Sequence, residues 1–263
     1  ETVYLRKVFA RVRDLQPETT GIFITSAENN EFFAGCDRVV LEQPVDASVI
    51  GLPASEREFT KTIESAGIDV LFSSLRTAPV KPRVPQVLYT MDLQFILEPL
   101  AKGRWRDKAM VKRVVQTCEN AVAIVAPSEF IRRQLLELLE VPLDRVVVAP
   151  LGVSDVFAEP QACWVQQPYF LSVGATRASK NVEGLLRAFQ FFESRGPHSL
   201  VVAGLPGDRE FRDWGPRVMR IQQCPENALA ALYQHCEAVV CASFYEGSGV
   251  MVLEAMRAGA QLV

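Results

Sequence analysis

The feature that most constrains the fold is an alternation of short apolar runs with longer stretches of helical periodicity. Several runs are apolar throughout, such as Val146-Val147-Val148 and Leu200-Val201-Val202. Such runs are typical of strands buried on both faces of a parallel sheet, with helices as the connections. The sequence therefore predicts an α/β chain with doubly wound, Rossmann-like parallel sheets. The predicted strands are residues 20–26, 38–41, 70–73, 86–90, 121–126, 145–149, 169–173, 199–203, 217–221, 238–241 and 260–263.

A break in this alternation predicts two domains. The stretch 151–168 (LGVSDVFAEPQACWVQQP) contains two prolines and has no clear period. We expect a first α/β domain over residues 1–152, a linker over 153–167 and a second domain over 168–263. Ligands of such domains bind beyond the carboxyl ends of the strands. The predicted helices lie near residues 1–14, 55–66, 103–118, 128–140, 181–195, 226–236 and 249–258.

Composition narrows the class of protein. No apolar run approaches the roughly 20 residues that span a bilayer, and no signal peptide is visible. The formal net charge of −3 argues against a nucleic-acid binder. The six cysteines form no CxxC pair, which favours free thiols in a reducing cytoplasm over zinc ligands or disulfides. The sequence opens in a helical pattern and stops within an apolar run, and we expect a fragment truncated at both ends, with an incomplete second domain.

The segment from Phe244 to Met256, FYEGSGVMVLEAM, is the main candidate for a site. An apolar strand leads into a glycine turn, and a helix is predicted to begin near Gly249. A helix start with small residues suits a diphosphate, because backbone N–H groups and the helix dipole favour an anion there. Glu246 and Glu254 flank the turn and can accept hydrogen bonds from sugar hydroxyls. From spacing alone, a tight turn with two solvated glutamates is the favoured interpretation.

The segment EGSGVMVLEAM resembles the E-x7-E motif of the family-4 retaining glycosyltransferases of the GT-B fold (glycosyl transferases group 1). Other landmarks of that family follow in order. Residues 169–174 (YFLSVG) with Lys180-Asn181 are similar to its basic diphosphate-binding loop. Residues 148–153 (VAPLGV) are similar to its interdomain strand and hinge, and 90–94 (TMDLQ) to its THDLQ segment. The resemblance covers nearly the whole chain and is strongest over 169–263.

The resemblance implies two domains facing across a cleft, with the acceptor on the first and a nucleoside-diphosphate sugar on the second. A hexose would pass to a glycan or lipid-linked acceptor with retention of configuration, without a metal or other cofactor. Glu246 would hold the donor sugar, and Asp92 would face the cleft as the second catalytic residue. The donor-binding residues implied are Gly174, Arg177, Lys180, Gly247, Ser248, Gly249, Val250 and Glu254.

Some residues depart from the family pattern and keep a second interpretation open. Met91 stands where the family often has a histidine, and Ala175 where many members have an arginine. These departures favour a catalytically impaired glycosyltransferase-like domain that binds nucleotide or a partner protein. A nucleotide-sugar epimerase lacks the E-x7-E spacing, and no G-x-G-x-x-G follows a strand as a dinucleotide-dependent oxidoreductase requires.

The stretch 102–113 carries six basic residues and one acidic residue. A basic stretch of this kind suits peripheral contact with the cytoplasmic membrane face or a lipid-diphosphate acceptor. A solvated helix face is the favoured interpretation.

Overall fold

The computed structural model describes the chain except for residues 1, 27–30, 32–35, 42–52, 98–104, 175–177, 194–195 and 205–213. The chain divides into two compact units, Glu1–Pro150 and Leu151–Val263.

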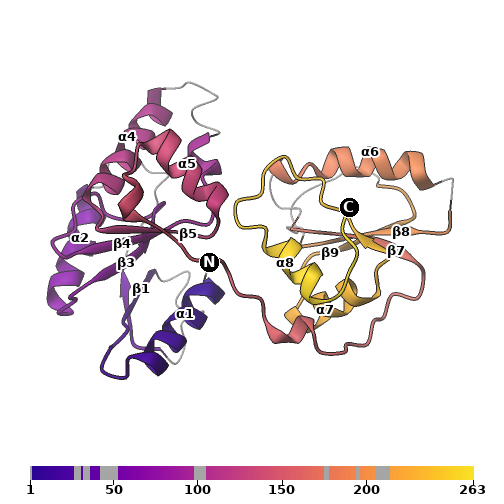
Figure 1. Ribbon diagram of the computed structural model, residues 1–263, viewed down its shortest axis with the longest axis horizontal. Helices are drawn as coiled ribbons and strands as arrows, with labels where there is room; N and C mark the ends of the chain where they lie inside the picture. Colours follow the sequence, from indigo (N-terminus) through magenta and orange to yellow (C-terminus); the bar gives the residue numbers. More distant parts are fainter. Residues whose placement is uncertain are drawn as a thin grey trace. The chain divides into compact units, whose positions relative to one another are not determined.

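The first unit is built on a parallel sheet with the order β3-β4-β5-β6. Helices α4 and α5 connect β4 to β5 and β5 to β6, and both lie on the same side of this sheet (Figure 1). The buried side chains of Leu88 and Ile124 place the core at the central strands. The elements are β3 (Leu71–Ser74), β4 (Gln86–Tyr89), α4 (Trp105–Asn120), β5 (Ala123–Ala126), α5 (Glu129–Leu139), η2 (Leu143–Arg145) and β6 (Val146–Val148).

A second, two-stranded parallel sheet belongs to the same unit. It pairs β1 (Phe23–Ser26) with β2 (Arg38–Leu41). In the chain, α1 (Thr2–Leu15) precedes β1 and α2 (Pro53–Ser65) follows β2. Phe9 of α1 packs edge-to-face against Phe23 of β1 at 5.3 Å and against Phe72 of β3 at 5.9 Å, between ring centroids. Aromatic contacts therefore join α1 to strands of both sheets.

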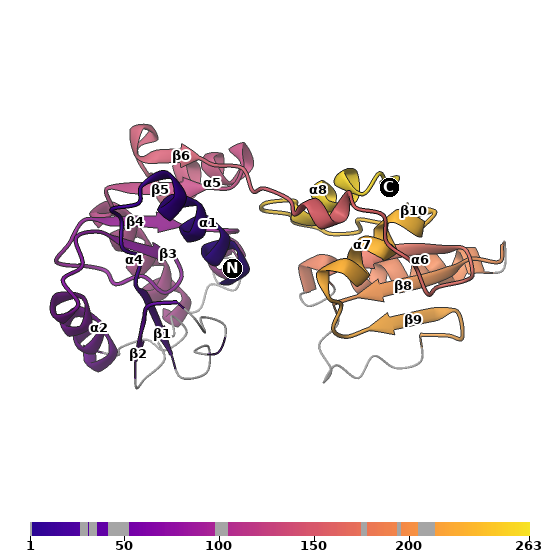
Figure 2. The same cartoon turned by 90° about the horizontal axis from the view of Figure 1, so that it is seen from below.

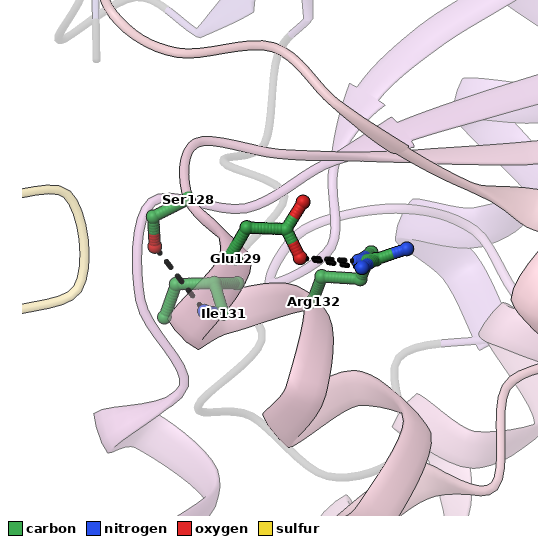
Figure 3. A network of polar contacts seen from close by, with 4 residues as sticks. All are labelled: Ser128, Glu129, Ile131 and Arg132. Atoms are coloured by element: carbon green, nitrogen blue, oxygen red, sulfur yellow. Dashed lines mark hydrogen bonds and ion pairs between the residues drawn. The ribbon is translucent and has the colours of Figure 1, made fainter.

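Helix α5 shows how the sequence fixes a helix start. Ser128 is extended (φ −157°) and its Oγ accepts a hydrogen bond from the N–H of Ile131 at 3.2 Å (Figure 3). This contact satisfies one of the N–H groups that a first turn leaves open. Glu129 pairs with Arg132 one turn later at 2.6 Å. The helix ends before Glu140, which adopts a left-handed conformation (φ 51°).

The second unit contains a parallel sheet with the order β10-β7-β8-β9. Helix α6 covers one face, and α7 and α8 cover the other (Figures 1 and 2). Tyr233 and Val239, both 0% exposed, lie in the core on the α7–α8 side. The elements are β7 (Tyr169–Val173), η4 (Ala178–Lys180), α6 (Val182–Glu193), β8 (Ser199–Ala203), β9 (Val218–Ile221), α7 (Glu226–His235), β10 (Ala238–Val239) and α8 (Val250–Arg257).

The stretch 153–167, for which the sequence predicts a linker, packs against the second unit. It contains a short helical turn, η3 (Asp155–Phe157), and the Phe157 ring lies 5.8 Å from that of Tyr233. Phe157 is 1% exposed. The Gln234 side chain donates to the carbonyls of Phe157 and Glu159 at 3.0 and 2.7 Å. Contacts with side chains of α7 therefore hold this irregular stretch of backbone in place.

The predicted parallel α/β architecture is confirmed: strands 38–41, 169–173 and 199–203 match at both ends, and the other predicted strands up to residue 241 shift by one to three residues at one end or both. The last predicted strand, residues 260–263, is the main correction. It forms one bridge, between Val239 and Leu262, supported by bonds such as Val263 N–H to the Val239 carbonyl at 2.9 Å. The N–H of Val239 also donates to the Gln261 carbonyl, and the N–H of Cys241 to the Val263 carbonyl, both at 2.8 Å. The segment therefore lies beside β10 (Ala238–Val239) as a short extended stretch with one bridge.

Two further observations concern composition. All six cysteines are free. In the described part of the chain, no helix combines the length and apolar character needed to cross a membrane.

Candidate functional site

The second unit has a topological switch point between β7 and β10. The chain leaves β7 through α6 to reach β8 on one side, and returns through α7 to place β10 on the other side. In open parallel sheets the two crossover helices then lie on opposite faces, and a crevice opens beyond the carboxyl ends of the two strands. The loops that leave these ends are residues 174–181 and 240–249, and both contain predicted site residues.

Lys180 and Glu246 meet at this point. Lys180 Nζ donates to Glu246 Oε1 at 2.5 Å, although the residues are 66 positions apart in the sequence. Their side chains are 22% and 27% exposed, so the pair is shielded but still open to solvent. An ammonium group has three N–H donors and a carboxylate can accept several hydrogen bonds. Lys180 can therefore still donate to a phosphate, and Glu246 can still accept from a hydroxyl.

Hydrogen bonds between the two loops hold them together around this pair. The N–H of Phe244 donates to the carbonyl of Ser179 at 2.8 Å. Asn181 Nδ2 donates to the carbonyl of Ala242 at 3.1 Å. Asn181 is left-handed (φ 50°), a conformation that asparagine tolerates better than most residues. The position of Lys180 relative to Glu246 is thus set by contacts on both sides of Lys180.

Gly174 directly follows β7 and lies next to the side chain of Lys180. Its φ is +79°, and a Cβ built on it would lie 3.7 Å from Cε and 3.9 Å from Nζ of Lys180. Its N–H donates to the carbonyl of Ala203 at 2.9 Å. A left-handed backbone of this kind favours glycine. Glycine at this position therefore turns the chain out of the sheet directly beside the lysine.

The turn before α8 presents a helix amino terminus. Gly249 is the N-cap with φ 62°, and no side chain caps the helix. Intrahelical bonding begins with Leu253 N–H to the Gly249 carbonyl at 3.1 Å. The N–H groups of the first turn are therefore not used by the helix and favour an anion. Gly247, Ser248 and Val250 are all partly exposed in this turn.

Glu254 lies one turn into α8 and contacts α7. Its Oε2 accepts a hydrogen bond from the hydroxyl of Tyr233 at 3.1 Å. Burial, and then the charge of Glu254, raise the pKa of Tyr233 above its usual range. The phenol therefore remains a protonated donor to the carboxylate.

Two predicted site residues lie outside the described part of the second unit. Arg177 lies outside the described residues. Asp92 belongs to the first unit, after β4, where its Oδ1 accepts from the N–H of Gln94 at 3.1 Å and its carbonyl accepts from Thr90 Oγ1 at 2.7 Å. Met91 precedes it and is partly exposed. Within the ranges that the structure describes, no group of three or more His, Cys, Asp or Glu residues can hold a metal ion.

The sequence did not single out Asn181 or Tyr233 as site residues. Asn181 entered the family resemblance beside Lys180 and was given no role of its own. Tyr233 lies in a predicted helix and was also given no role. Both act through contacts with residues 61 and 21 positions away.

Comparisons with known proteins agree with this fold. Residues 159–263 match the family model described as glycosyl transferases group 1. The O-antigen chain mannosyltransferase B of Escherichia coli is 30% identical over 194 residues, which cover 65% of this chain and 50% of that protein. A serotype-specific mannosyltransferase of Escherichia coli is 27% identical over 171 residues, covering 54% of this chain and 20% of that protein. The chain thus spans half of the first relative and a fifth of the second.

Solved structures give the fold class. The Anabaena HepE structure, a complex with UDP-glucose, has a TM-score of 0.66 at 13% identity and covers 91% of this chain and 71% of its own. WaaG, a glycosyltransferase involved in lipopolysaccharide biosynthesis, has a TM-score of 0.64 at 15% identity and covers 86% and 67%.

The two parallel α/β units and these neighbours give the chain the GT-B fold. Residues 159–263, which contain the paired Lys180 and Glu246, are the part of the chain that matches the glycosyl transferases group 1 model.

Proposed function

We propose that the chain acts as a retaining glycosyltransferase that moves a hexose from a nucleoside-diphosphate sugar to a glycan or lipid-linked acceptor. The single observation that carries this proposal is the Lys180–Glu246 pair at the switch point of the second unit. A cation and a hydroxyl-binding carboxylate at one point suit a ligand with a diphosphate joined directly to a sugar. The mannosyltransferase relatives make a mannosyl donor the first to test.

The diphosphate is the part of the donor that most needs stabilisation. As the bond from the anomeric carbon to the diphosphate oxygen breaks, the departing diphosphate keeps the electron pair and gains charge. Fixed positive groups are most effective where charge develops in the transition state. Lys180, Arg177 and the N–H groups at the start of α8 would supply them, with Gly247, Ser248, Gly249 and Val250 allowing close approach.

The two glutamates would bind the parts of the donor on either side of the diphosphate. Glu246 would accept hydrogen bonds from hydroxyls of the transferred hexose while Lys180 moves from it toward the phosphates. Glu254, further along α8, would accept from the ribose. Asp92 of the first unit would contact the donor sugar or the acceptor hydroxyl, which loses its proton as the new glycosidic bond forms.

A second function stays open: a glycosyltransferase-like domain that binds a nucleotide without turnover. Met91, a residue that cannot make a strong hydrogen bond, is the observation that favours it, because it replaces a polar side chain of the family pattern beside Asp92. Both functions require the nucleotide site, but only the first includes transfer of the sugar.

Two measurements separate these functions. The first is a thermal-shift screen with UDP, GDP, ADP and their sugars, in which a ligand at 100 times its Kd stabilises by about 2.7 kcal/mol. The second is release of labelled mannose or glucose from the stabilising donor, with Glu246→Ala and the exposed control Glu237→Ala. Turnover that Glu246→Ala abolishes and Glu237→Ala preserves supports the enzyme. Binding without turnover supports the alternative, and a flat screen contradicts both.

A further inference from the structure

The Tyr233 hydroxyl donates a hydrogen bond to the Glu254 carboxylate, and packing of the tyrosine ring does not by itself require this bond. We propose that Tyr233 is a positioning residue that orients the Glu254 carboxylate for the hydroxyls of a ribose, so that this pair selects ribonucleotide over 2′-deoxyribonucleotide donors. This inference rests on the proposed function, in which the second unit binds a nucleoside diphosphate.

The phenol is fixed before any ligand arrives. Tyr233 is 0% exposed, and its ring packs edge-to-face against Phe157 at 5.8 Å between centroids. A buried hydroxyl requires a hydrogen-bond partner, and here the hydroxyl donates to Glu254 Oε2 at 3.1 Å. The tyrosine therefore has one ring position and donates to the carboxylate from the core side.

Helix α8 is held by a second contact near its end. Arg257 donates to Asp155 of η3 at 2.7 Å, and η3 also carries Phe157. The same short segment thus supports both the tyrosine ring and the helix that bears Glu254. A site that must hold a ligand within a fraction of an ångström needs supporting residues of this kind.

The carboxylate keeps capacity for a ligand. Glu254 is only partly buried, and an ionised carboxylate has about four lone-pair sites on its two oxygens. The bond from Tyr233 orients the group and occupies one site on Oε2. An oriented carboxylate can accept from two neighbouring hydroxyls, the arrangement of the ribose 2′ and 3′ positions.

This role predicts an effect on selectivity. Removal of the phenol oxygen should leave the diphosphate contacts of Lys180 and the α8 amino terminus in place. The affinity that is lost should come from the contacts between Glu254 and the ribose hydroxyls. A purely structural tyrosine would instead weaken the binding of ribose and deoxyribose nucleotides by the same factor.

The test measures Kd for two ligands by isothermal titration: the diphosphate among UDP, GDP and ADP that binds most tightly, and its 2′-deoxy form. Wild type should prefer the ribose form by about tenfold, the size of one hydrogen bond to a charged group. Glu254→Ala should abolish the preference and Tyr233→Phe should reduce it to about threefold or less. Tyr233→Phe should bind the 2′-deoxy form within about twofold of wild type, which reports an intact diphosphate site.

The outcomes distinguish the inference from the function on which it rests. Wild type that binds no diphosphate overturns the proposed function and the inference together. Wild type that prefers ribose through Glu254, with an undiminished preference in Tyr233→Phe, overturns the inference alone. Equal weakening of both ligands in Tyr233→Phe also overturns it, because the tyrosine would then only support the fold.

Discussion

Lys180 Nζ and Glu246 Oε1 lie 2.5 Å apart across the switch point of the second unit, and each residue follows a different strand of the sheet. In the absence of a ligand the lysine is neutralised by the glutamate. A bound diphosphate would compete for the ammonium group and free the carboxylate for sugar hydroxyls. The pair would therefore couple the binding of the two halves of the donor.

Lys180→Ala should lower donor affinity and turnover while leaving the fold intact. Removal of one fixed charge that stabilises a leaving group costs about 10²–10³-fold in kcat. The matched control is Arg187→Ala on α6, whose side chain is 76% exposed and lies 3.7 Å from Glu183. Steady-state kinetics of both variants check this prediction, and equal effects would contradict it.

Gly249→Ala should destabilise the second unit, because the N-cap of α8 is left-handed (φ 62°) although a Cβ there would meet no atom within 4 Å. The expected cost is about 1 kcal/mol of backbone strain. Gly152→Ala is the control, since Gly152 has the same open surroundings without a positive φ. Urea unfolding of the two variants measures the difference, and an equal midpoint would rule out strain at Gly249.

Gly184→Ala should show coupling with Asn181. A Cβ at Gly184 would lie 2.5 Å from the Asn181 side-chain oxygen, so the side chain must leave the Ala242 carbonyl. In an Asn181→Ala background the clash is absent, and alanine should stabilise α6 by about 0.5–1 kcal/mol over glycine. A double-mutant cycle in the free energy of unfolding tests this. Additive effects would mean that a methyl group at position 184 does not displace the Asn181 side chain.

Phe157→Ala should destabilise the second unit strongly, although the residue lies in the stretch for which the sequence predicts a linker. Truncation of a buried phenylalanine costs about 3–5 kcal/mol. Phe191→Ala is the control, because Phe191 is 80% exposed. Thermal unfolding compares the two, and a Phe157 variant as stable as the Phe191 variant would show that the segment is only a tether.

Alkaline pH should destabilise the first unit through Cys118. Burial, and then the charge of Glu119, raise the pKa of Cys118 from its ordinary value of 9.0 to about 12. The folded state therefore holds the thiol proton more tightly than the unfolded state. This contribution to stability is fully present below pH 9 and is lost as pH rises toward 12.

The loss from Cys118 between pH 8 and pH 11 should be about 2–3 kcal/mol. Cys118→Ala should reduce the alkaline fall in unfolding free energy by that amount. An unchanged pH profile in the variant would contradict the raised pKa.

The sequence predicted the sheets better than the contacts between loops. Residues 169–173 and 199–203 form strands as predicted, because solidly apolar runs have one favourable environment in a parallel α/β fold. The stretch around Phe157 has no period, and its burial depends on α7, some 70 residues later. No local pattern contains that information.

The same limit applies to the site. The residue types of the glycine turn and its two glutamates were visible as a motif. The Lys180–Glu246 pair depends on the adjacency of β7 and β10, in which Ala238 pairs with Phe170. Strand order is a tertiary property, since β8, α6, β9 and α7 intervene in the chain. Sequence could therefore propose the members of the site but not their pairing.

The most direct test of the proposed site is the Kd of the wild-type chain and its Lys180→Ala and Arg187→Ala variants for UDP, GDP and ADP, measured by isothermal titration. We predict that at least one diphosphate binds the wild type at one site, that Lys180→Ala weakens this binding about tenfold or more, and that Arg187→Ala leaves it unchanged. Absence of diphosphate binding, or equal affinities in the two variants, would contradict a donor site at the Lys180–Glu246 pair.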